Sequence, residues 1–332
     1  MDTDRPVLES HPCNLCGSRT SRRYAKKFGL QIVACRRCGL VRVEPRLAEA
    51  DILKRYSADY LYRDYLPVFR ADRNGVDLNL VTSHYIFYLK LAGRVFSPGG
   101  RLLDVGCGAG LFLKAAESLG WAVEGVEVSP AAAEYAASIL KVPVRNEKLE
   151  QAGFPDASFD VVTLLDTLEH LGDPLGTLVE AHRVLKPGGR LILNTPDLGS
   201  ASRAVLGKAW AVLTPAEHLT YFREGTLRRM LERAGFEVPV LVNLLRLSPD
   251  FTNAPSALRS RLWKRLLGRP RAKKILENAP ILEYIELLTH GPGRPIEDPA
   301  TATVFTDEER RSIRTAKRYV KGDILLAVAV KV

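Results

Sequence analysis

The residues best suited to chemistry lie in one glycine-rich stretch, residues 101–113, which reads RLLDVGCGAGLFL. Its apolar start predicts a strand, and Gly106, Gly108 and Gly110 predict a tight turn that leads into a helix. Such a turn places backbone N–H groups and a helix N-terminus beside a bound ligand, and glycine lets the backbone come close to it. Asp104 precedes the turn, where it can orient the turn or accept a hydrogen bond from an amino group. The stretch therefore predicts a cofactor site.

A second chemical signal ends the next expected strand, residues 122–127. Its last residue is Glu127, whose carboxylate can accept both hydroxyls of a ribose. A dinucleotide-binding turn reads G-x-G-x-x-G, whereas here the third glycine comes one position early. The pattern suits a nucleoside that carries an amino-acid tail and no pyrophosphate, and it indicates S-adenosylmethionine as the cofactor.

From these residues on, the sequence resembles the class I S-adenosylmethionine-dependent methyltransferases, in particular their type 11 and type 23 groups. The likeness continues through FPDASFDVV, LEH, VLKPGGR and AGF, and it spans about residues 98–240. It is closest to the subset with an N-terminal cysteine ribbon and an E-H-L-x-Y-F segment, here residues 217–222. The resemblance implies an α/β fold with a doubly wound, seven-stranded Rossmann-like methyltransferase sheet, a small N-terminal zinc ribbon and a helical cap.

The resemblance also implies which residues contact the cofactor: Asp104, Gly106, Cys107, Gly108, Gly110, Glu127, Val128, Lys148, Leu149 and Asp166. After the third strand, many relatives carry an aspartate that reads the adenine amino group, but this sequence has Lys148 there. A backbone contact from Lys148 or Leu149 is therefore the alternative to a side-chain contact. Cys107 has no partner in the cysteine pattern, and we interpret it as a small packing residue within the turn.

Two segments supply candidate catalytic side chains. Asp166, Glu169 and His170 fall at i, i+3 and i+4 after the fourth strand, so a helical turn would direct them together to the mouth of the site. Three interpretations stay open: polar contacts that keep the fold, a base or acceptor-orienting role for His170, or a divalent-ion site. His218 is the second candidate base, since a neutral imidazole can accept a proton from a hydroxyl near pH 7. Its alternative role is to hold its loop by bonding to a backbone carbonyl.

Residues 47–97 predict a helical cap that is rich in tyrosine and phenylalanine. Packing of these rings on the main domain is one interpretation; the other is that some tyrosines line the substrate mouth, where a rigid ring with a polar tip is useful. In the resembling family such a cap lies over the cofactor and the acceptor. We therefore expect one or two of Tyr56, Tyr60 and Tyr62 to contact the substrate, together with Tyr221 of the later loop.

Four cysteines form two matched pairs near the N-terminus, Cys13-x2-Cys16 and Cys35-x2-Cys38, and a glycine follows each pair. The glycines allow tight turns that point two thiolates at one ion, and four soft ligands favour tetrahedral zinc. Disulfides and four unrelated core cysteines are the alternatives; a reducing cytosol argues against the first, and the matched spacing against the second. With no open ligand position, the expected zinc is structural.

The order of the motifs predicts five segments: a zinc-ribbon-like segment at 1–46, the helical cap or linker at 47–97, the cofactor-binding core at 98–244, a basic helical insertion at 245–302, and a helix with the last core strand at 303–332. Within the core, strands are expected near 101–105, 122–127, 142–145, 159–165, 190–194 and 237–244, and the last strand near 324–330. Ser129-Pro130 and Asp173-Pro174 are typical of helix starts.

The 332-residue chain carries a net charge of +10. Its lysines and arginines gather around the cysteines and at 259–274, and such clusters are either solvated faces or contacts with RNA or an anionic membrane. Because no apolar run is long enough for a membrane span and the N-terminus lacks a signal-peptide pattern, a cytoplasmic protein is the default expectation.

Three functions remain open at this point. The first is methyl transfer to O or C of a small molecule, such as a sugar, a lipid-linked or quinone-like intermediate, or a secondary metabolite. The second is base methylation of ribosomal or transfer RNA, with the ribbon and the basic clusters binding phosphates. The third is a non-catalytic scaffold that binds the cofactor.

Overall fold

The computed structural model describes residues 6–79, 81–82, 85, 88, 99–244 and 324–332. The expected basic insertion at 245–302, with its 259–274 cluster, lies outside these residues. So do the helix expected before the last strand and most of the second half of the cap.

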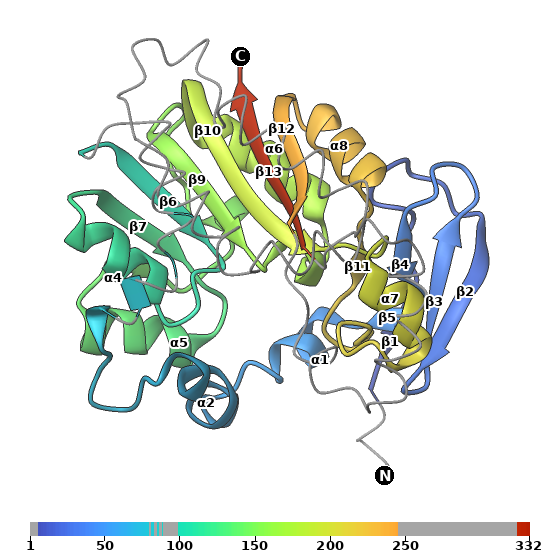
Figure 1. Ribbon diagram of the computed structural model, residues 1–332, viewed down its shortest axis with the longest axis horizontal. Helices are drawn as coiled ribbons and strands as arrows, with labels where there is room; N and C mark the ends of the chain where they lie inside the picture. Colours follow the sequence, from blue (N-terminus) through green and yellow to red (C-terminus); the bar gives the residue numbers. More distant parts are fainter. Residues whose placement is uncertain (1–5, 80, 83–84, 86–87, 89–98, 245–323) are drawn as a thin grey trace, which may run out of the picture.

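A seven-stranded sheet forms the centre of the molecule (Figure 1). Its strands, in spatial order, are β12 (Phe236–Leu244), β13 (Ile324–Lys331), β10 (Leu185–Pro196), β9 (Phe159–Leu165), β6 (Arg101–Val105), β7 (Ala122–Val126) and β8 (Val144–Arg145). β13 pairs antiparallel with both of its neighbours, whereas the strands from β10 to β8 pair in parallel. The predicted doubly wound sheet is thus confirmed. β10 differs from the expected 190–194, because pairing with β9 already begins at Leu185 and resumes after a register shift.

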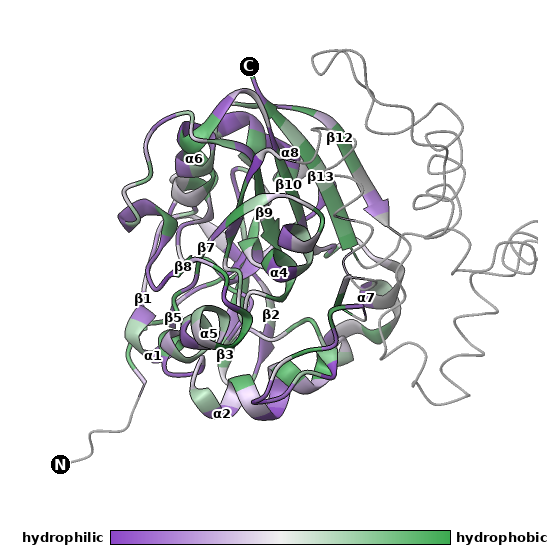
Figure 2. Cartoon of the chain, turned by 90° about the vertical axis from the view of Figure 1, so that its left-hand side faces the viewer, coloured by the Kyte–Doolittle hydropathy of each residue, from purple (hydrophilic) through white to green (hydrophobic). Residues whose placement is uncertain are grey.

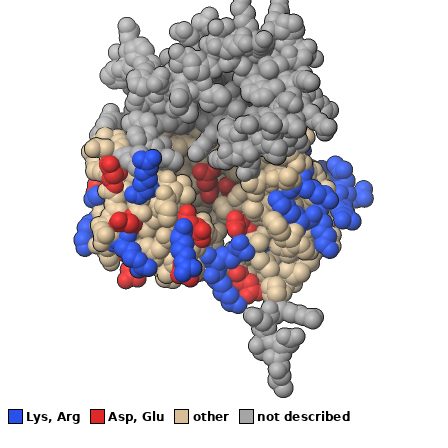
Figure 3. Space-filling view, turned by 60° about the horizontal axis from the view of Figure 1, so that its bottom comes forward, with Lys and Arg blue, Asp and Glu red and all other residues tan. Residues whose placement is uncertain are grey.

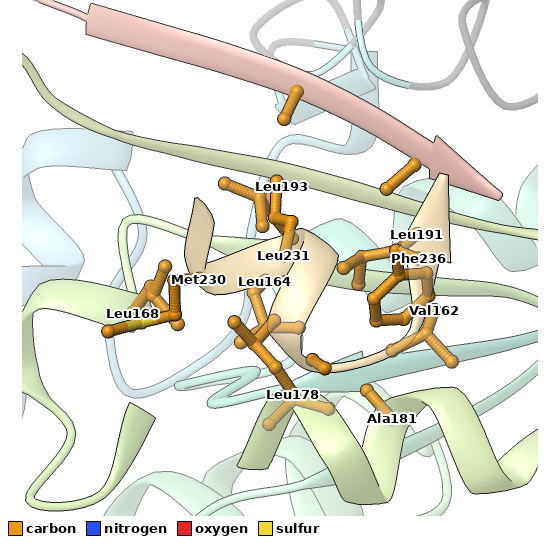
Figure 4. Packing of buried hydrophobic residues seen from close by; sticks show 14 of the residues in the cluster. Val162, Leu164, Leu168, Leu178, Ala181, Leu191, Leu193, Met230, Leu231 and Phe236 are labelled. Carbon is orange, nitrogen blue, oxygen red and sulfur yellow. The ribbon is translucent and has the colours of Figure 1, made fainter. Parts of the chain in front are cut away.

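Helices cover both faces of this sheet because its strands are apolar on both sides. α4 (Leu111–Ser118), α5 (Pro130–Tyr135) and the π-helical η3 (Ala136–Leu140) pack on one face, and α6 (Pro174–Val184) and α8 (Glu224–Arg233) on the other. Figure 2 shows the hydrophobic strands between these helices. In Figure 4, Leu231 of α8 lies beside Leu193 of β10, and Leu178 of α6 lies below Leu164 of β9. The side chains of Ser129 and Asp173 cap α5 and α6, as predicted.

The N-terminal ribbon contains two small sheets. β1 (Leu8–Glu9) pairs with β5 (Arg46–Leu47), and a second sheet has the order β11-β4-β3-β2. Its strands are β2 (Ser21–Lys27), β3 (Leu30–Cys35), β4 (Val41–Val43) and β11 (Thr220–Tyr221). β11 belongs to the E-H-L-x-Y-F segment, about 180 residues further along the chain than β4, so long-range pairing joins the ribbon to the core. Arg46 and Asn14 of the ribbon also donate to the carbonyl of Gly172 in the core, at 2.7 and 2.9 Å.

Short helices follow the ribbon: α1 (Glu49–Leu53), α2 (Ala58–Tyr60), the π-helical η1 (Leu61–Tyr65) and the 3₁₀-helical η2 (Leu66–Phe69). Further short elements are η4 (Leu149–Gln151), η5 (Leu168–His170), α7 (Ala201–Leu206) and η6 (Gly207–Ala209). Among the described residues, no helix combines the length and the apolar character that crossing a membrane requires.

Candidate functional site

The glycine turn after β6 lies against two neighbouring segments. Gly106 and Gly108 have φ angles of 71° and 54°, in the left-handed region that glycine adopts most readily. A Cβ at position 106 would lie 2.5 Å from Cγ2 of Thr167, and one at position 108 would lie 2.7 Å from the hydroxyl of Tyr65. Both glycines therefore allow a close approach that an alanine would prevent.

Glu127 closes the turn from the end of β7. Its side-chain oxygens accept the backbone N–H groups of Gly108 at 2.9 Å and of Ser129 at 2.7 Å. Burial raises the pKa of Glu127, and these two hydrogen bonds oppose the rise. An ionised carboxylate offers about four acceptor positions, so two remain for the hydroxyls of a ribose.

Asp104 lies deeper, with 3% of its surface exposed. The hydroxyl of Thr163 donates to Oδ1 of Asp104 at 2.6 Å. Burial raises the pKa of Asp104 to about 7, the bond from Thr163 opposes the rise, and the charge of Glu127 adds to it. This carboxyl therefore changes its charge near neutral pH.

A cavity of about 770 Å³ extends from the glycine turn to the ribbon. Ten of the predicted site residues line it: Tyr56, Tyr60, Gly106, Gly108, Glu127, Val128, Lys148, Leu149, Asp166 and His170. Six lie outside its lining: Tyr62, Asp104, Cys107, Gly110, His218 and Tyr221. The ribbon contributes to the wall through Glu9, His11, Arg46 and Leu47.

Two of the predicted substrate tyrosines pack elsewhere. The ring of Tyr62 meets Tyr135 edge-on at 6.4 Å and lies 3.9 Å from the guanidinium of Arg73. Tyr221 is buried in the ribbon core, and its ring meets that of His218 edge-on at 6.3 Å. Among the described residues its hydroxyl has no hydrogen-bond partner. Neither position favours contact with a substrate.

Other aromatic residues of the cap, for which packing alone was expected, also line the cavity: Tyr65, Phe69, Tyr85 and Tyr88. The chain passes from α-helix through a π-helical turn to a 3₁₀ helix between positions 58 and 69. These changes alter the number of residues per turn, so helical spacing does not show which tyrosines face inward.

Two histidines from distant segments meet beside the cavity. The rings of His170, in η5, and His218, just before β11, lie 4.6 Å apart and nearly perpendicular. Nδ1 of His218 lies 2.7 Å from the carbonyl oxygen of Val212, so Nδ1 is the donor and Nε2 is left as an acceptor. This carbonyl contact is the loop-holding role considered for His218, and it leaves the other nitrogen free for chemistry. Nδ1 of His170 lies 3.4 Å from the hydroxyl of Tyr56.

Both imidazoles are held neutral. Burial, and then the charge of the neighbouring His218, lower the pKa of His170. Burial also lowers the pKa of His218. Each ring is therefore in its proton-accepting form at neutral pH.

The carboxyl group next to this pair is that of Glu169 rather than Asp166. Glu169 is 2% exposed, accepts the hydroxyl of Thr195 at 2.8 Å, and lies 3.9 Å from Nε2 of His170. Burial and the charge of Asp166 raise the pKa of Glu169 to about 8. Ligand atoms of Glu169, His170 and His218 lie within 4.8 Å of one another, close enough to hold a divalent ion.

The spacing predicted that Asp166 shares a helical turn with Glu169 and His170. In the structure it does not. Its φ of 51° places it in the left-handed region, before η5 begins. Its N–H donates to Oδ1 of Asn194 at 3.0 Å, and Nδ2 of Asn194 donates back to Oδ1 of Asp166 at 2.8 Å. Asp166 is thus fixed at the cavity wall, apart from the histidine pair.

The four ribbon cysteines converge on one point. Sγ of Cys13 lies 3.5 Å from that of Cys38, the same distance separates Cys16 from Cys35, and all four sulfurs lie within 4.8 Å of one another. Zinc–sulfur bonds of about 2.3 Å in a tetrahedron bring sulfurs to nearly this separation. Both following glycines have positive φ angles, as the predicted turns require. The cysteines therefore fit zinc, and they are not unrelated core residues.

The chain is similar to known methyltransferases. Residues 85–239 match a family described as "Methyltransferase domain". The ubiquinone biosynthesis O-methyltransferase of Xanthomonas campestris pv. campestris is 39% identical over 134 residues, which cover 39% of this chain and 54% of that protein. That of Xanthomonas axonopodis pv. citri is 31% identical over 180 residues, which cover 51% and 73%. The chain thus spans about half the length of the first of these relatives.

A solved structure of an S-adenosylmethionine-dependent methyltransferase from Archaeoglobus fulgidus is also similar, at 17% identity. It covers 80% of this chain and 98% of its own, with a TM-score of 0.48. The sheet order, the glycine turn that Glu127 closes, and the curated relatives lead to one conclusion: this chain belongs to the class I S-adenosylmethionine-dependent methyltransferases.

Proposed function

We propose that the protein transfers a methyl group from S-adenosylmethionine to a hydroxyl oxygen, or to an acidic carbon, of a small molecule. The observation that carries this proposal is the neutral pair of His170 and His218 beside the cavity whose other side holds the glycine turn and Glu127. The cavity thus offers a cofactor side and an acceptor side at once. Relatives named as O-methyltransferases support oxygen as the acceptor atom.

On the cofactor side, the chain binds and orients. S-adenosylmethionine, when bound, supplies an activated methyl group together with its own leaving group. Glu127 accepts the ribose hydroxyls, the glycine turn lets the backbone come close to the cofactor, and Asp104 supplies negative charge behind the turn. Lys148 and Leu149 line the adenine end. This side is expected to raise the rate by positioning the cofactor, because in-line transfer depends on the alignment of the acceptor, the methyl group and the sulfur.

On the acceptor side, His170 accepts the proton that the hydroxyl loses. It lines the cavity, whereas His218 stands behind it. His218 then acts on the ring of His170, and Tyr56 orients His170 from the other side at 3.4 Å. Bound metal at Glu169, His170 and His218 is the alternative use of the same side chains; there the ion would polarise the hydroxyl.

The charge of the cavity favours a small acceptor over RNA. Its described lining carries these carboxylates: Glu9, Glu49, Glu127, Glu147, Glu150, Asp166 and Asp173. The two cationic side chains of that lining, Arg46 and Lys148, already have partners in Gly172 and Glu49. Such a lining repels the phosphates of a polynucleotide.

A labelling experiment tests the assignment. The protein is incubated with radiolabelled S-adenosylmethionine and host-cell extract, and the extract is then separated into RNA, protein, lipid and small-molecule pools. We expect label in the lipid or small-molecule pool, and none with Glu127→Ala, which removes both ribose acceptors. Label in the RNA pool would contradict the proposal, and an absence of label in every pool would favour the scaffold.

Once an acceptor is found, His170→Gln and His218→Gln separate the roles of the two rings. We expect His170→Gln to lower kcat about 10²–10⁴-fold, as loss of a general base does, with less effect from His218→Gln. The pKa of His170 is lowered, so the wild-type rate should persist at pH values below the ordinary histidine range near 6.5. Tyr62→Phe, outside the cavity lining, is the control. Equal rates for wild type and His170→Gln, or restoration of activity by added divalent metal alone, would refute the base role.

Asp104→Asn should change stability with pH. The pKa of Asp104 in the fold, about 7, is raised above its ordinary value. Burial therefore favours the protonated form, whose stabilising contribution is complete below the unfolded pKa of 3.8 and is lost progressively as pH rises to about 7. We expect the Tm of Asp104→Asn, measured without cofactor, to rise relative to the Tm of wild type between pH 5 and pH 8. S-adenosylmethionine should raise the Tm of Asp104→Asn by less than it raises the Tm of wild type. A Tm difference that does not vary with pH would contradict this account.

Zinc in the ribbon is the other part of the proposal. We expect purified protein to contain about one zinc per chain, and Cys38→Ser to lose most of it with a clear fall in Tm, because structural zinc contributes folding energy. Cys107→Ser, which changes the one cysteine outside the ribbon, should retain the metal. Full zinc content in Cys38→Ser, measured by elemental analysis, would refute the site.

A further inference from the structure

The turn between β2 and β3 carries an unexpected residue. Phe28 and Gly29 are its two central residues, and both have positive φ angles, of 49° and 79°. Asparagine, aspartate and glycine are the usual residues in such a turn, and a bulky side chain there is strained. Phe28 is also 72% exposed. Neither local backbone preference nor packing therefore accounts for a phenylalanine at this tip.

The strands that lead to this tip are strongly basic. Residues 10–43 contain eight lysines and arginines and neither aspartate nor glutamate. Arg22, Arg23 and Lys26 of β2 are exposed, and no ion pair with a carboxylate is found for them in the described part of the chain. Nζ of Lys27 lies 5.1 Å from the centre of the Phe28 ring. Figure 3 shows lysines and arginines gathered at the right-hand edge, the side on which β2 lies in Figure 1.

Protection of a sheet edge does not explain the combination. β2 is the outer strand of its sheet among the described residues, and lysines on such a strand ordinarily prevent association with other chains. An exposed aromatic ring at the end of the same strand works against that protection. The ring and the cations together instead match a surface that is apolar inside and anionic outside.

We propose that the β2–β3 hairpin docks on an anionic phospholipid bilayer, with Phe28 inserted below the headgroups and the surrounding lysines and arginines on lipid phosphates. A single ring at a convex tip can enter a bilayer, whereas single-stranded RNA is bound by grooves with open ring faces. Here the ammonium of Lys27 already lies close to the exposed ring of Phe28. RNA is therefore the less suitable partner.

Docking has a consequence for the acceptor, and this step rests on the proposed function. β5 of the ribbon lines the cavity through Arg46 and Leu47. A ribbon held on the bilayer therefore keeps the cavity near the lipid surface. That placement fits an acceptor carried by a lipid or dissolved in one.

Sedimentation of the full chain with vesicles tests the docking without cofactor or acceptor, so its outcome is independent of catalysis. The vesicles contain phosphatidylcholine, either alone or with about a third of phosphatidylglycerol. We expect binding to the anionic vesicles, a loss of about tenfold in affinity for Phe28→Asn, and a further loss with salt for both proteins. Asparagine suits a positive φ, so the Tm of Phe28→Asn should equal or exceed that of wild type.

Val68→Asn is the matched control, because Val68 is equally exposed, at 72%, but lies outside the ribbon. It should bind the vesicles as wild type does. The proposal is overturned if Phe28→Asn binds like wild type, if wild type binds neutral vesicles equally or binds neither kind, or if Phe28→Asn weakens binding of a single-stranded RNA oligonucleotide and leaves vesicle binding intact.

Discussion

The two backbone hydrogen bonds of Leu219 connect the parts on which the site depends. Its N–H donates to the carbonyl of Glu169 at 2.8 Å, and its own carbonyl accepts the N–H of Val43 at 2.9 Å. The first bond connects η5, which carries His170, to the segment that carries His218. The second ties that segment to the ribbon. Because β11 follows directly, the ribbon sheet fixes His218 against His170, and the four ribbon cysteines support this histidine pair indirectly.

This arrangement explains how far the sequence predicts the molecule. The glycine turn depends on contacts that are local or lie at neighbouring strand ends, so spacing was enough to bring Gly106, Gly108 and Glu127 to one cavity and to predict the caps Ser129 and Asp173. The acceptor side depends on contacts between residues far apart in the chain. His170 and His218 were each named, but nothing in the sequence shows that β11 brings their rings together.

Two expectations failed for backbone reasons. The positive φ of Asp166 turns it out of the helical turn that its i, i+3 and i+4 spacing suggested, and Glu169 takes its place beside the histidines. The π-helical turn in the cap shifts which tyrosines face inward, so Tyr65 rather than Tyr62 reaches the cavity. The first feature is a dihedral angle at one residue, and the second is a change of helix type over five residues. Residue type predicts both only weakly.

The distribution of charge separates two tasks within one chain. A net charge of +10 coexists with a cavity whose described lining is rich in carboxylates. Asp104, Glu127 and Glu169 are each less than 9% exposed, and burial raises their pKa values. A hydrogen-bond donor or a positive charge therefore suits each of these carboxyl groups better than a phosphate does. The ribbon surface has the opposite character. Under the two proposals, attraction to an anionic surface would act on the outside of the ribbon, and the interior of the cavity would favour an acceptor that is neutral or cationic where it meets the cofactor.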